Sequence, residues 1–138
     1  MGLDLTLKIL VVDDMPAMRS ILRGMLEELG FKEIHEAEDG DLAWEMLQAA
    51  ATEPSGGFAL VISDWNMPGM TGVDLLRALR SAKETRDIPF LMVTARGDQG
   101  HIAEATQAGV TDYVVKPFNA AQLGEKISAV LTFKPHRG

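Results

Sequence analysis

The stretch Lys8-Ile9-Leu10-Val11-Val12-Asp13-Asp14 joins a continuous apolar run to two adjacent carboxylates. A strand with one face in water alternates apolar and polar residues, whereas a strand buried on both faces is apolar along its whole length. The run therefore predicts a central strand of a parallel sheet. Its abrupt end in two charges raises the question of whether other strands end in the same way.

Comparable apolar runs recur along the chain and alternate with segments of helical periodicity. The other expected strands are 34–37, 58–62, 89–93 and 113–115. After each strand, apolar residues three or four positions apart predict an amphipathic helix. Five strands alternating with five helices favour an α/β fold, a doubly wound parallel sheet with helices on both faces. Strand 34–37 is the most polar, so we expect it at an edge.

Composition limits the class of protein. The 138 residues are 46% hydrophobic, which is enough for one domain with one core. The net charge of −7 argues against nucleic acid or an anionic membrane as a partner. The absence of cysteine excludes disulfides, thiolate zinc sites and a cysteine nucleophile. Neither a signal-peptide layout nor a membrane-spanning segment is present, so we expect a cytoplasmic protein.

Polar residues follow each buried strand. Right-handed crossovers place the carboxyl ends of parallel strands at one edge of the sheet, where ligands bind. The residues expected at that edge are Asp13-Asp14, Asp64, Thr94-Ala95 and Lys116-Pro117. Crowded carboxylates repel one another, and burial raises their pKa values further. Either water solvates them, with Asp14 as a helix N-cap, or a cation neutralises them.

Magnesium suits such a cluster because it prefers oxygen ligands and binds through one or two carboxylates together with a phosphate. Lys116 and Thr94 then supply a positive charge and a hydroxyl group for the oxygens of that phosphate. The sequence contains no glycine-rich nucleotide loop. The phosphate acceptor is therefore expected to be a side chain of the site, and Asp64 stands in its middle.

Five motifs follow one another in a specific order. They are Leu10-Val11-Val12-Asp13-Asp14, Glu36-Ala37-Glu38-Asp39-Gly40, Ser63-Asp64-Trp65-Asn66-Met67-Pro68, Leu91-Met92-Val93-Thr94-Ala95 and Tyr113-Val114-Val115-Lys116-Pro117-Phe118. With them the sequence resembles response-regulator receiver domains, most of all the single-domain chemotaxis regulators. The resemblance implies that residues 1–138 form one receiver domain, with a core of about 7–131. It also implies a flavodoxin-like sheet with the strand order 2-1-3-4-5.

The resemblance assigns roles to the strand-end residues. Asp64 is the phosphoacceptor. Asp14 and Asp64, Asp13 through water, and the backbone carbonyl of Asn66 are the implied magnesium ligands. Lys116 and Thr94 are implied to contact the phosphoryl oxygens, and Tyr113 to turn inward when Thr94 moves.

The implied function is two-component signalling rather than conventional enzyme catalysis, although the domain would catalyse its own phosphorylation and dephosphorylation. A sensor histidine kinase would donate the phosphoryl group. Phosphorylation would switch the face made by the fourth helix, fifth strand and fifth helix. That face would bind the flagellar switch or another protein target, and a phosphatase is a further partner. We expect a monomer; the alternative is a stand-alone receiver in another phosphorelay.

Some positions depart from the chemotaxis regulators. Arg96 stands where receivers tune dephosphorylation, and Thr71 stands where they usually carry an acid or an amide. The segment 50–57 is longer than in the chemotaxis relatives. Gly97 and Gly100 weaken the start of the fourth helix, which we therefore expect around residues 99–101.

Two rival classes use related chemistry. A magnesium-dependent phosphatase of small molecules would need an acid/base carboxylate two residues after its nucleophile, where this chain has Asn66. A flavodoxin-type FMN carrier would need a hydroxyl-rich phosphate loop after the first strand, where Asp13 and Asp14 would repel the phosphate. Two local expectations complete the prediction: Trp65 should be partly exposed, and the Lys116–Pro117 bond should be cis.

Overall fold

The computed structural model of the chain describes residues 5–54, 57–95 and 99–132. Arg96, Gly97, Asp98 and part of the segment 50–57 lie outside the described residues, so the expectations for them stay predictions. The elements are β1 (Lys8–Val12), α1 (Pro16–Glu28), β2 (Glu33–Ala37), α2 (Gly40–Ala51), β3 (Leu60–Asp64), α3 (Gly72–Ser81), β4 (Phe90–Ala95), α4 (Gln99–Ala108), β5 (Asp112–Lys116) and α5 (Ala120–Thr132).

The five strands form one sheet in the order β2-β1-β3-β4-β5. All four pairs of neighbours are parallel, and the register aligns Val12 of β1 with Ser63 of β3. The strand order reverses between β1 and β3, which is where doubly wound sheets open a crevice for ligands. The predicted flavodoxin-like topology is confirmed, including the edge position of β2.

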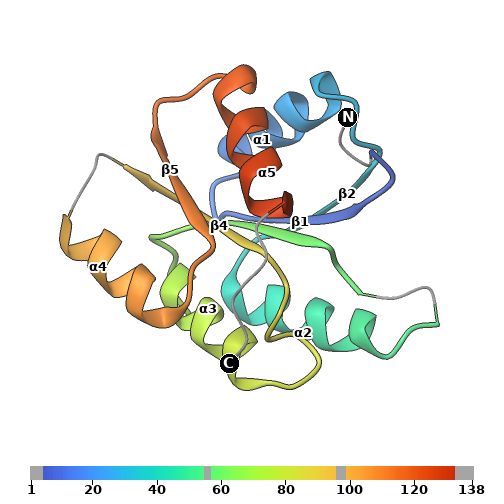
Figure 1. The fold of residues 1–138 in the computed structure, drawn as a ribbon, viewed down its shortest axis with the longest axis vertical. Coiled ribbons are helices and arrows are strands. Elements are labelled where there is room, and N and C mark those ends of the chain that lie inside the picture. The colour runs from blue at the N-terminus through green and yellow to red at the C-terminus, as the bar shows by residue number, and fades with distance from the viewer. Residues whose placement is uncertain (1–4, 55–56, 96–98, 133–138) are drawn as a thin grey trace.

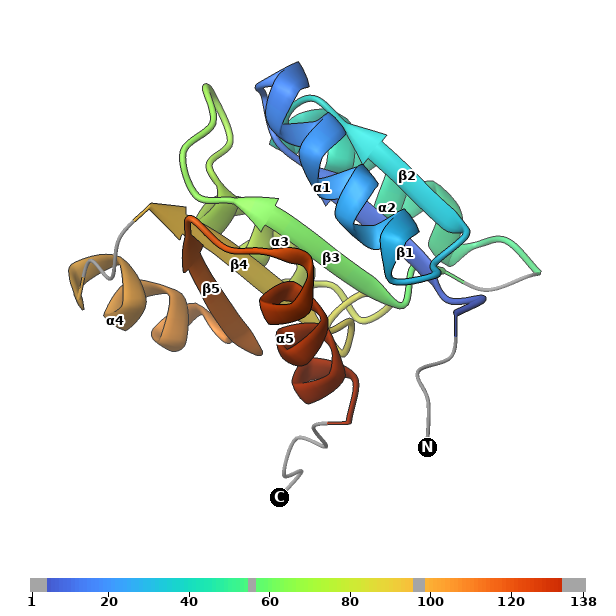
Figure 2. The same ribbon diagram turned by 90° about the horizontal axis from the view of Figure 1, so that it is seen from above.

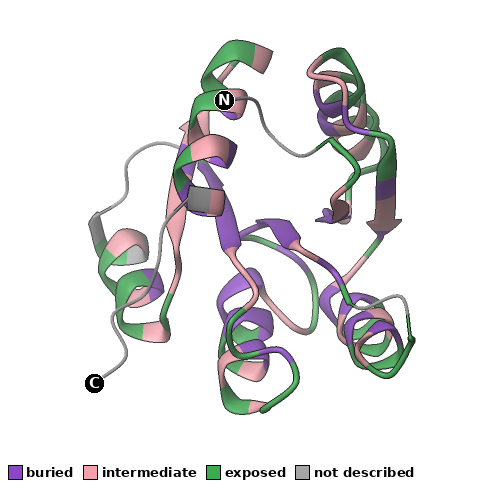
Figure 3. Cartoon of the chain, turned by 45° about the vertical axis from the view of Figure 1, so that its right-hand side comes forward, coloured by how far each residue is buried: buried purple, intermediate pink, exposed green. Residues whose placement is uncertain are grey.

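Helices cover both faces of the sheet. Helices α1 and α5 lie on one face, and α2, α3 and α4 lie on the other (Figure 1). Viewed from above, α1 lies by β1 and β2, and α5 lies by β4 and β5 (Figure 2). The buried residues concentrate in the strands and on the inward sides of the helices (Figure 3). The core is thus split into two layers, one on each face of β1, β3 and β4.

The helix starts near the site follow local capping rules. Thr71 accepts a hydrogen bond from the Asp74 N–H at 3.2 Å, and Asp74 Oδ2 accepts one from the Thr71 N–H at 3.1 Å. Thr71 is therefore the N-cap of α3, a position that Asp and Asn also favour. Helix α4 begins at Gln99, as predicted.

Strand β3 begins at Leu60, two residues later than predicted. Phe58 is buried, at 6% exposure, but its ring packs edge-on against His35 with the centroids 5.4 Å apart. An apolar run therefore predicted burial correctly but not the strand boundary. None of the described helices is both long enough and apolar enough to cross a bilayer.

Candidate functional site

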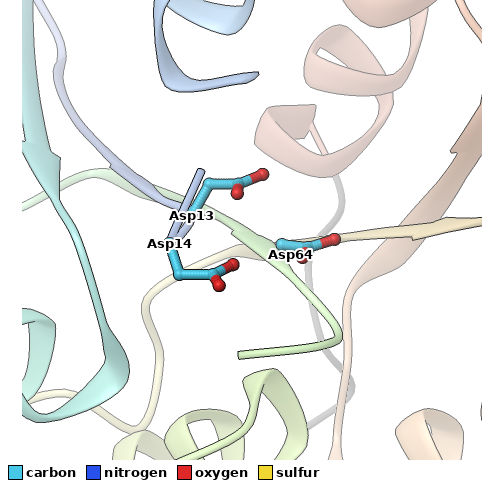
Figure 4. Close-up of side chains that lie close together, drawn as sticks. All are labelled: Asp13, Asp14 and Asp64. Carbon is cyan, nitrogen blue, oxygen red and sulfur yellow. The ribbon is translucent and has the colours of Figure 1, made fainter. Parts of the chain in front are cut away.

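Three carboxylates meet at the carboxyl edge of the sheet. Asp13 and Asp14 follow directly after β1, and Asp64 is the last residue of β3. One ligand oxygen of each lies within 4.8 Å of the others. Figure 4 shows the three side chains projecting from the two neighbouring strands into the same space. The sequence prediction that parallel topology brings them together is confirmed.

Asp13 is the most enclosed of the three, with 1% of its surface exposed. Its Oδ1 accepts a hydrogen bond from the Met15 N–H at 2.9 Å. Its Oδ2 is buried and has no hydrogen-bond partner within the described part of the chain. Burial raises the pKa of Asp13, the hydrogen bond from Met15 opposes this, and the charge of Asp64 adds to it. The ionised carboxylate is therefore unfavourable without a further positive charge.

Asp14 is more open to solvent than Asp13. The alternative role considered for it, the N-cap of α1, falls instead to Met15, whose side chain makes no capping hydrogen bond. Helix capping therefore does not account for Asp14, whereas the buried Asp13 is the carboxylate that water solvates least.

Asp64 pairs with a lysine at the same edge of the sheet, two strands away. Lys116 Nζ at the end of β5 lies 3.1 Å from Asp64 Oδ1. Burial nevertheless raises the pKa of Asp64, because the charge and hydrogen bond of Lys116 offset only part of the lost hydration. The Lys116–Pro117 bond is cis, as predicted.

Thr94 lies near the carboxyl end of β4, which pairs with β3, and adds a hydroxyl group to this edge of the sheet. It is 3% exposed, and its Oγ1 has no hydrogen-bond partner among the residues that the structure describes. An unpaired buried hydroxyl group costs stability unless a ligand uses it. Asn66 is exposed in the loop after Asp64. Its role as a carbonyl ligand stays a prediction.

Tyr113 is part of strand β5, which pairs with β4, and it is half-buried. The Lys126 Nζ of α5 lies 5.4 Å from the centroid of its ring and 3.4 Å from Asp112 Oδ2. Tyr113 thus packs under a cation on the outer side of β5 rather than within the carboxylate cluster. The predicted inward movement remains untested.

The prediction of a partly exposed Trp65 is wrong. Trp65 is 7% exposed and belongs to the core layer on the α2–α3 side of the sheet. The backbone N–H of Trp65 donates to the Val93 carbonyl at 3.0 Å, and its backbone carbonyl accepts from the Gly72 N–H at 3.0 Å. The residue after Asp64 is therefore held between β4 and α3 instead of entering the loop.

The donor set fits a hard divalent cation. The three acidic side chains offer only oxygen ligands, which magnesium prefers, and the buried Asp13 Oδ2 has no partner on the described chain. Burial raises the pKa values of Asp13 and Asp64 despite the nearby charge of Lys116, so their ionised forms are disfavoured without a cation. Asp13, Asp14 and Asp64 are the residues that would hold such an ion.

We expect Asp64→Asn to stabilise the metal-free protein by about 1 kcal/mol at neutral pH, since it removes one of the crowded charges but keeps an oxygen for Lys116. The folded-state pKa of Asp64 is raised, so its ionisation costs stability only above its unfolded value. The gain should therefore shrink as pH falls toward the ordinary aspartate pKa of 3.8. Urea unfolding of both proteins across that range measures it.

The matching control for this stability prediction is magnesium itself. Added magnesium should raise the melting temperature of the wild type more than that of the variant, because only the wild type retains all three carboxylates. Equal shifts in the two proteins would contradict a shared metal site.

Sequence reasoning missed an ionic network behind the site. Arg19 and Arg23 of α1 both reach Glu36 of β2, with Nε–O distances of 3.3 and 2.6 Å. Arg19 Nη1 also donates to the backbone carbonyl of Asp13 at 2.6 Å. The only signal in the sequence is two arginines one helical turn apart, which is also typical of a solvated helix surface.

Residues 9–128 match the family model of the response regulator receiver domain. The Chemotaxis protein CheY of Pseudomonas aeruginosa is 50% identical over 124 residues, which cover 90% of this chain and 95% of that protein. The Chemotaxis protein CheY-3 of Vibrio cholerae is 46% identical over 128 residues, 93% of this chain and 94% of that protein.

Solved structures agree with these relatives. The chemotaxis protein CheY4 of Vibrio cholerae superposes with a TM-score of 0.81 at 33% identity, covering 91% of this chain and 99% of that one. The receiver domain of a sensor histidine kinase from Pseudomonas aeruginosa, solved with a magnesium ion coordinated in its active-site cleft, gives 0.77 at 27% identity. That match covers 91% of this chain and 98% of the other.

Proposed function

The chain belongs to the response regulator receiver domain family and is a two-component response regulator; from this premise we propose that it accepts a phosphoryl group on Asp64. The observation that carries the proposal is the position of Asp64 between two other carboxylates and the ammonium group of a lysine. Two further carboxylates lie beside it, within 4.8 Å, and Lys116 Nζ lies 3.1 Å from its Oδ1. Phosphoryl transfer needs this combination of a positioned nucleophile and neutralised charge.

The reaction starts from a phosphohistidine of a sensor histidine kinase. An oxygen of Asp64 attacks the phosphorus, a phosphorus–oxygen bond forms, and the phosphorus–nitrogen bond of the donor breaks. The bonding electrons return to the imidazole nitrogen, which takes up a proton. Hydrolysis of the resulting acyl phosphate by water regenerates Asp64, so the domain catalyses its own phosphorylation and dephosphorylation without being a conventional enzyme.

Magnesium, held by Asp13, Asp14, Asp64 and the Asn66 carbonyl, would neutralise charge on the phosphoryl oxygens. Lys116 contributes a second positive charge on the opposite side of Asp64. The Thr94 hydroxyl group donates a hydrogen bond to a phosphoryl oxygen. Its burial without a partner on the described chain supports this role, because the phosphoryl group would satisfy it.

The output is binding of a protein target by the face that α4, β5 and α5 form. An acyl phosphate adds a charge of about −1.5 to −2 if it behaves like other phosphorylated side chains. Movement of Thr94 toward that charge would open space into which Tyr113 turns, away from Lys126. Such a small rearrangement is enough to bias a surface between two states.

The names of the relatives support a proposal for the target. Since proteins named for chemotaxis are 46–50% identical, the flagellar switch is the target that we propose. A sensor histidine kinase and a phosphatase complete the set of partners. We further propose a cytoplasmic monomer in which residues 1–138 form one receiver domain, which is supported by a single sheet that includes every described strand.

The test is phosphorylation by a small donor. Incubation with magnesium and acetyl phosphate should add one phosphoryl group per chain, detected by intact-protein mass spectrometry. The same incubation with a chelator should add none, since the carboxylates would then repel the anionic donor. A folded chain that stays unmodified in magnesium would contradict the proposal.

A further inference from the structure

Asp13 is held in place at three of its polar atoms. Its N–H donates to the Ala37 carbonyl of β2 at 3.2 Å. Its carboxylate Oδ1 accepts from the Met15 N–H at 2.9 Å, and its backbone carbonyl accepts from Arg19 Nη1 at 2.6 Å. The fourth, Oδ2, is buried without a partner on the described chain and belongs to the carboxylate cluster.

The contact from Arg19 has a particular geometric effect. The carbonyl of Asp13 belongs to the peptide unit that joins Asp13 to Asp14, and that unit is planar. Rotation of this plane would move Asp14 relative to Asp13. A hydrogen bond to its oxygen therefore fixes the backbone that carries both carboxylates, and Arg19 makes it to the carbonyl of Asp13.

Arg19 is itself held by a second layer of contacts. Its Nε donates to Glu36 Oε1 at 3.3 Å, and its side chain is only 17% exposed. Glu36 is fixed in turn by Arg23, whose Nε lies 2.6 Å from Oε2 and whose Nη2 donates to the Ile34 carbonyl at 2.7 Å. The pairing with Arg23 holds the pKa of Glu36 below its usual range, so Glu36 is anionic at neutral pH.

We propose that Arg19 is a positioning residue for the metal site: it sets the spacing of Asp13 and Asp14 through the peptide between them, and Glu36 locks its guanidinium. This inference rests on the proposed function, since it assumes that the carboxylates hold magnesium. Contacts that orient metal ligands in this way commonly change metal affinity by a factor of about 10 to 100. Arg23 differs from Arg19 because it reaches Glu36 and β2 without contacting Asp13.

That difference provides a matched pair of variants. Arg19→Met and Arg23→Met each remove one guanidinium from α1 and break one pairing with Glu36. The dissociation constant for magnesium is measured by titration of amide chemical shifts around Asp64 in solution NMR spectra, and the same spectra show that each variant is folded. We expect Arg19→Met to raise the dissociation constant about tenfold, whereas Arg23→Met should raise it several-fold less, because it loosens Glu36 but leaves the contact of Arg19 with the Asp13 carbonyl.

Arg19→Lys separates geometry from charge. A lysine ammonium group is compact and cannot reproduce a fork that donates to Glu36 and the Asp13 carbonyl together. We expect Arg19→Lys to bind magnesium about as weakly as Arg19→Met. Full affinity in Arg19→Lys would overturn the bridging role of the guanidinium.

The outcomes distinguish this inference from the proposed function. Magnesium that causes no shift in the wild type would overturn both. Normal binding by the wild type, with equal affinities in Arg19→Met and Arg23→Met, would overturn the positioning role alone. Urea unfolding of both variants provides the remaining check, because a merely structural role for Arg19 predicts lost stability without a selective loss of magnesium affinity.

Discussion

Asp64→Asn is expected to reduce phosphoryl incorporation from acetyl phosphate to background. The substitution preserves the shape of the side chain and leaves an oxygen near Lys116, but an amide is a poor nucleophile and no longer carries the negative charge that attacks phosphorus. Because the variant is also expected to be more stable than the wild type, lost incorporation cannot be attributed to unfolding. Intact-protein mass spectrometry after incubation with magnesium and acetyl phosphate measures the loss.

The control for this prediction is Asp41→Asn. Asp41 is an exposed carboxylate in the first turn of α2, and the substitution removes the same charge outside the cluster. It should leave incorporation at the wild-type level. Incorporation that persists in Asp64→Asn would place the acceptor on another residue, and hydroxylamine sensitivity would show whether that residue is a second carboxylate.

Gly72→Ala is expected to destabilise the protein by about 3 kcal/mol, the upper part of the usual range for overpacking. A Cβ at Gly72 would overlap the carbonyl oxygen of Asp64 and come within 2.9 Å of Met92 Sδ and 3.1 Å of Trp65 Cα. Two of these three atoms belong to the backbone, so a side-chain rotation cannot relieve the clash. The start of α3 would have to move away from the end of β3.

Gly24→Ala is the matched control for Gly72→Ala. Gly24 lies in the middle of α1 and is exposed, and apart from its own turn of helix no described residue has an atom within 4 Å of an added Cβ. It should therefore stabilise the protein by about 0.5–1 kcal/mol, the usual gain from alanine within a helix. Chemical denaturation of the two variants tests the pair. Similar effects at both positions would contradict the close packing of Gly72 against Asp64.

The sequence predicts the candidate site well where position along a strand determines position in space. Asp13, Asp14 and Asp64 each end a buried run, and Lys116 ends the last strand. Parallel topology brings such residues to one edge whatever the details of packing. For this reason the sequence alone assigns residues from three distant segments to one candidate site.

The sequence predictions fail where contacts between distant segments determine the burial or the partner of a residue. Trp65 follows a strand end and resembles a loop residue, but Gly72 has no side chain and lets α3 pack closely enough to bury it. Arg19 has the spacing of a solvated helix residue, and only the approach of β2 gives it Glu36 as a partner. Neither contact leaves a periodic signal in the sequence, so pattern reasoning could not find them.

The direction of the strands and helices also determines where a label or linker at either end of the fold lies relative to the carboxylates. In this fold every strand runs toward the carboxylates and every connecting helix runs back, so β1 begins and α5 ends at the opposite edge (Figure 2). A fluorophore, affinity handle or surface linker joined before Lys8 or after Thr132 would therefore be anchored far from Asp64. Immobilised molecules would present their reactive end to the solution, which makes the chain suitable as the sensing module of a fused reporter.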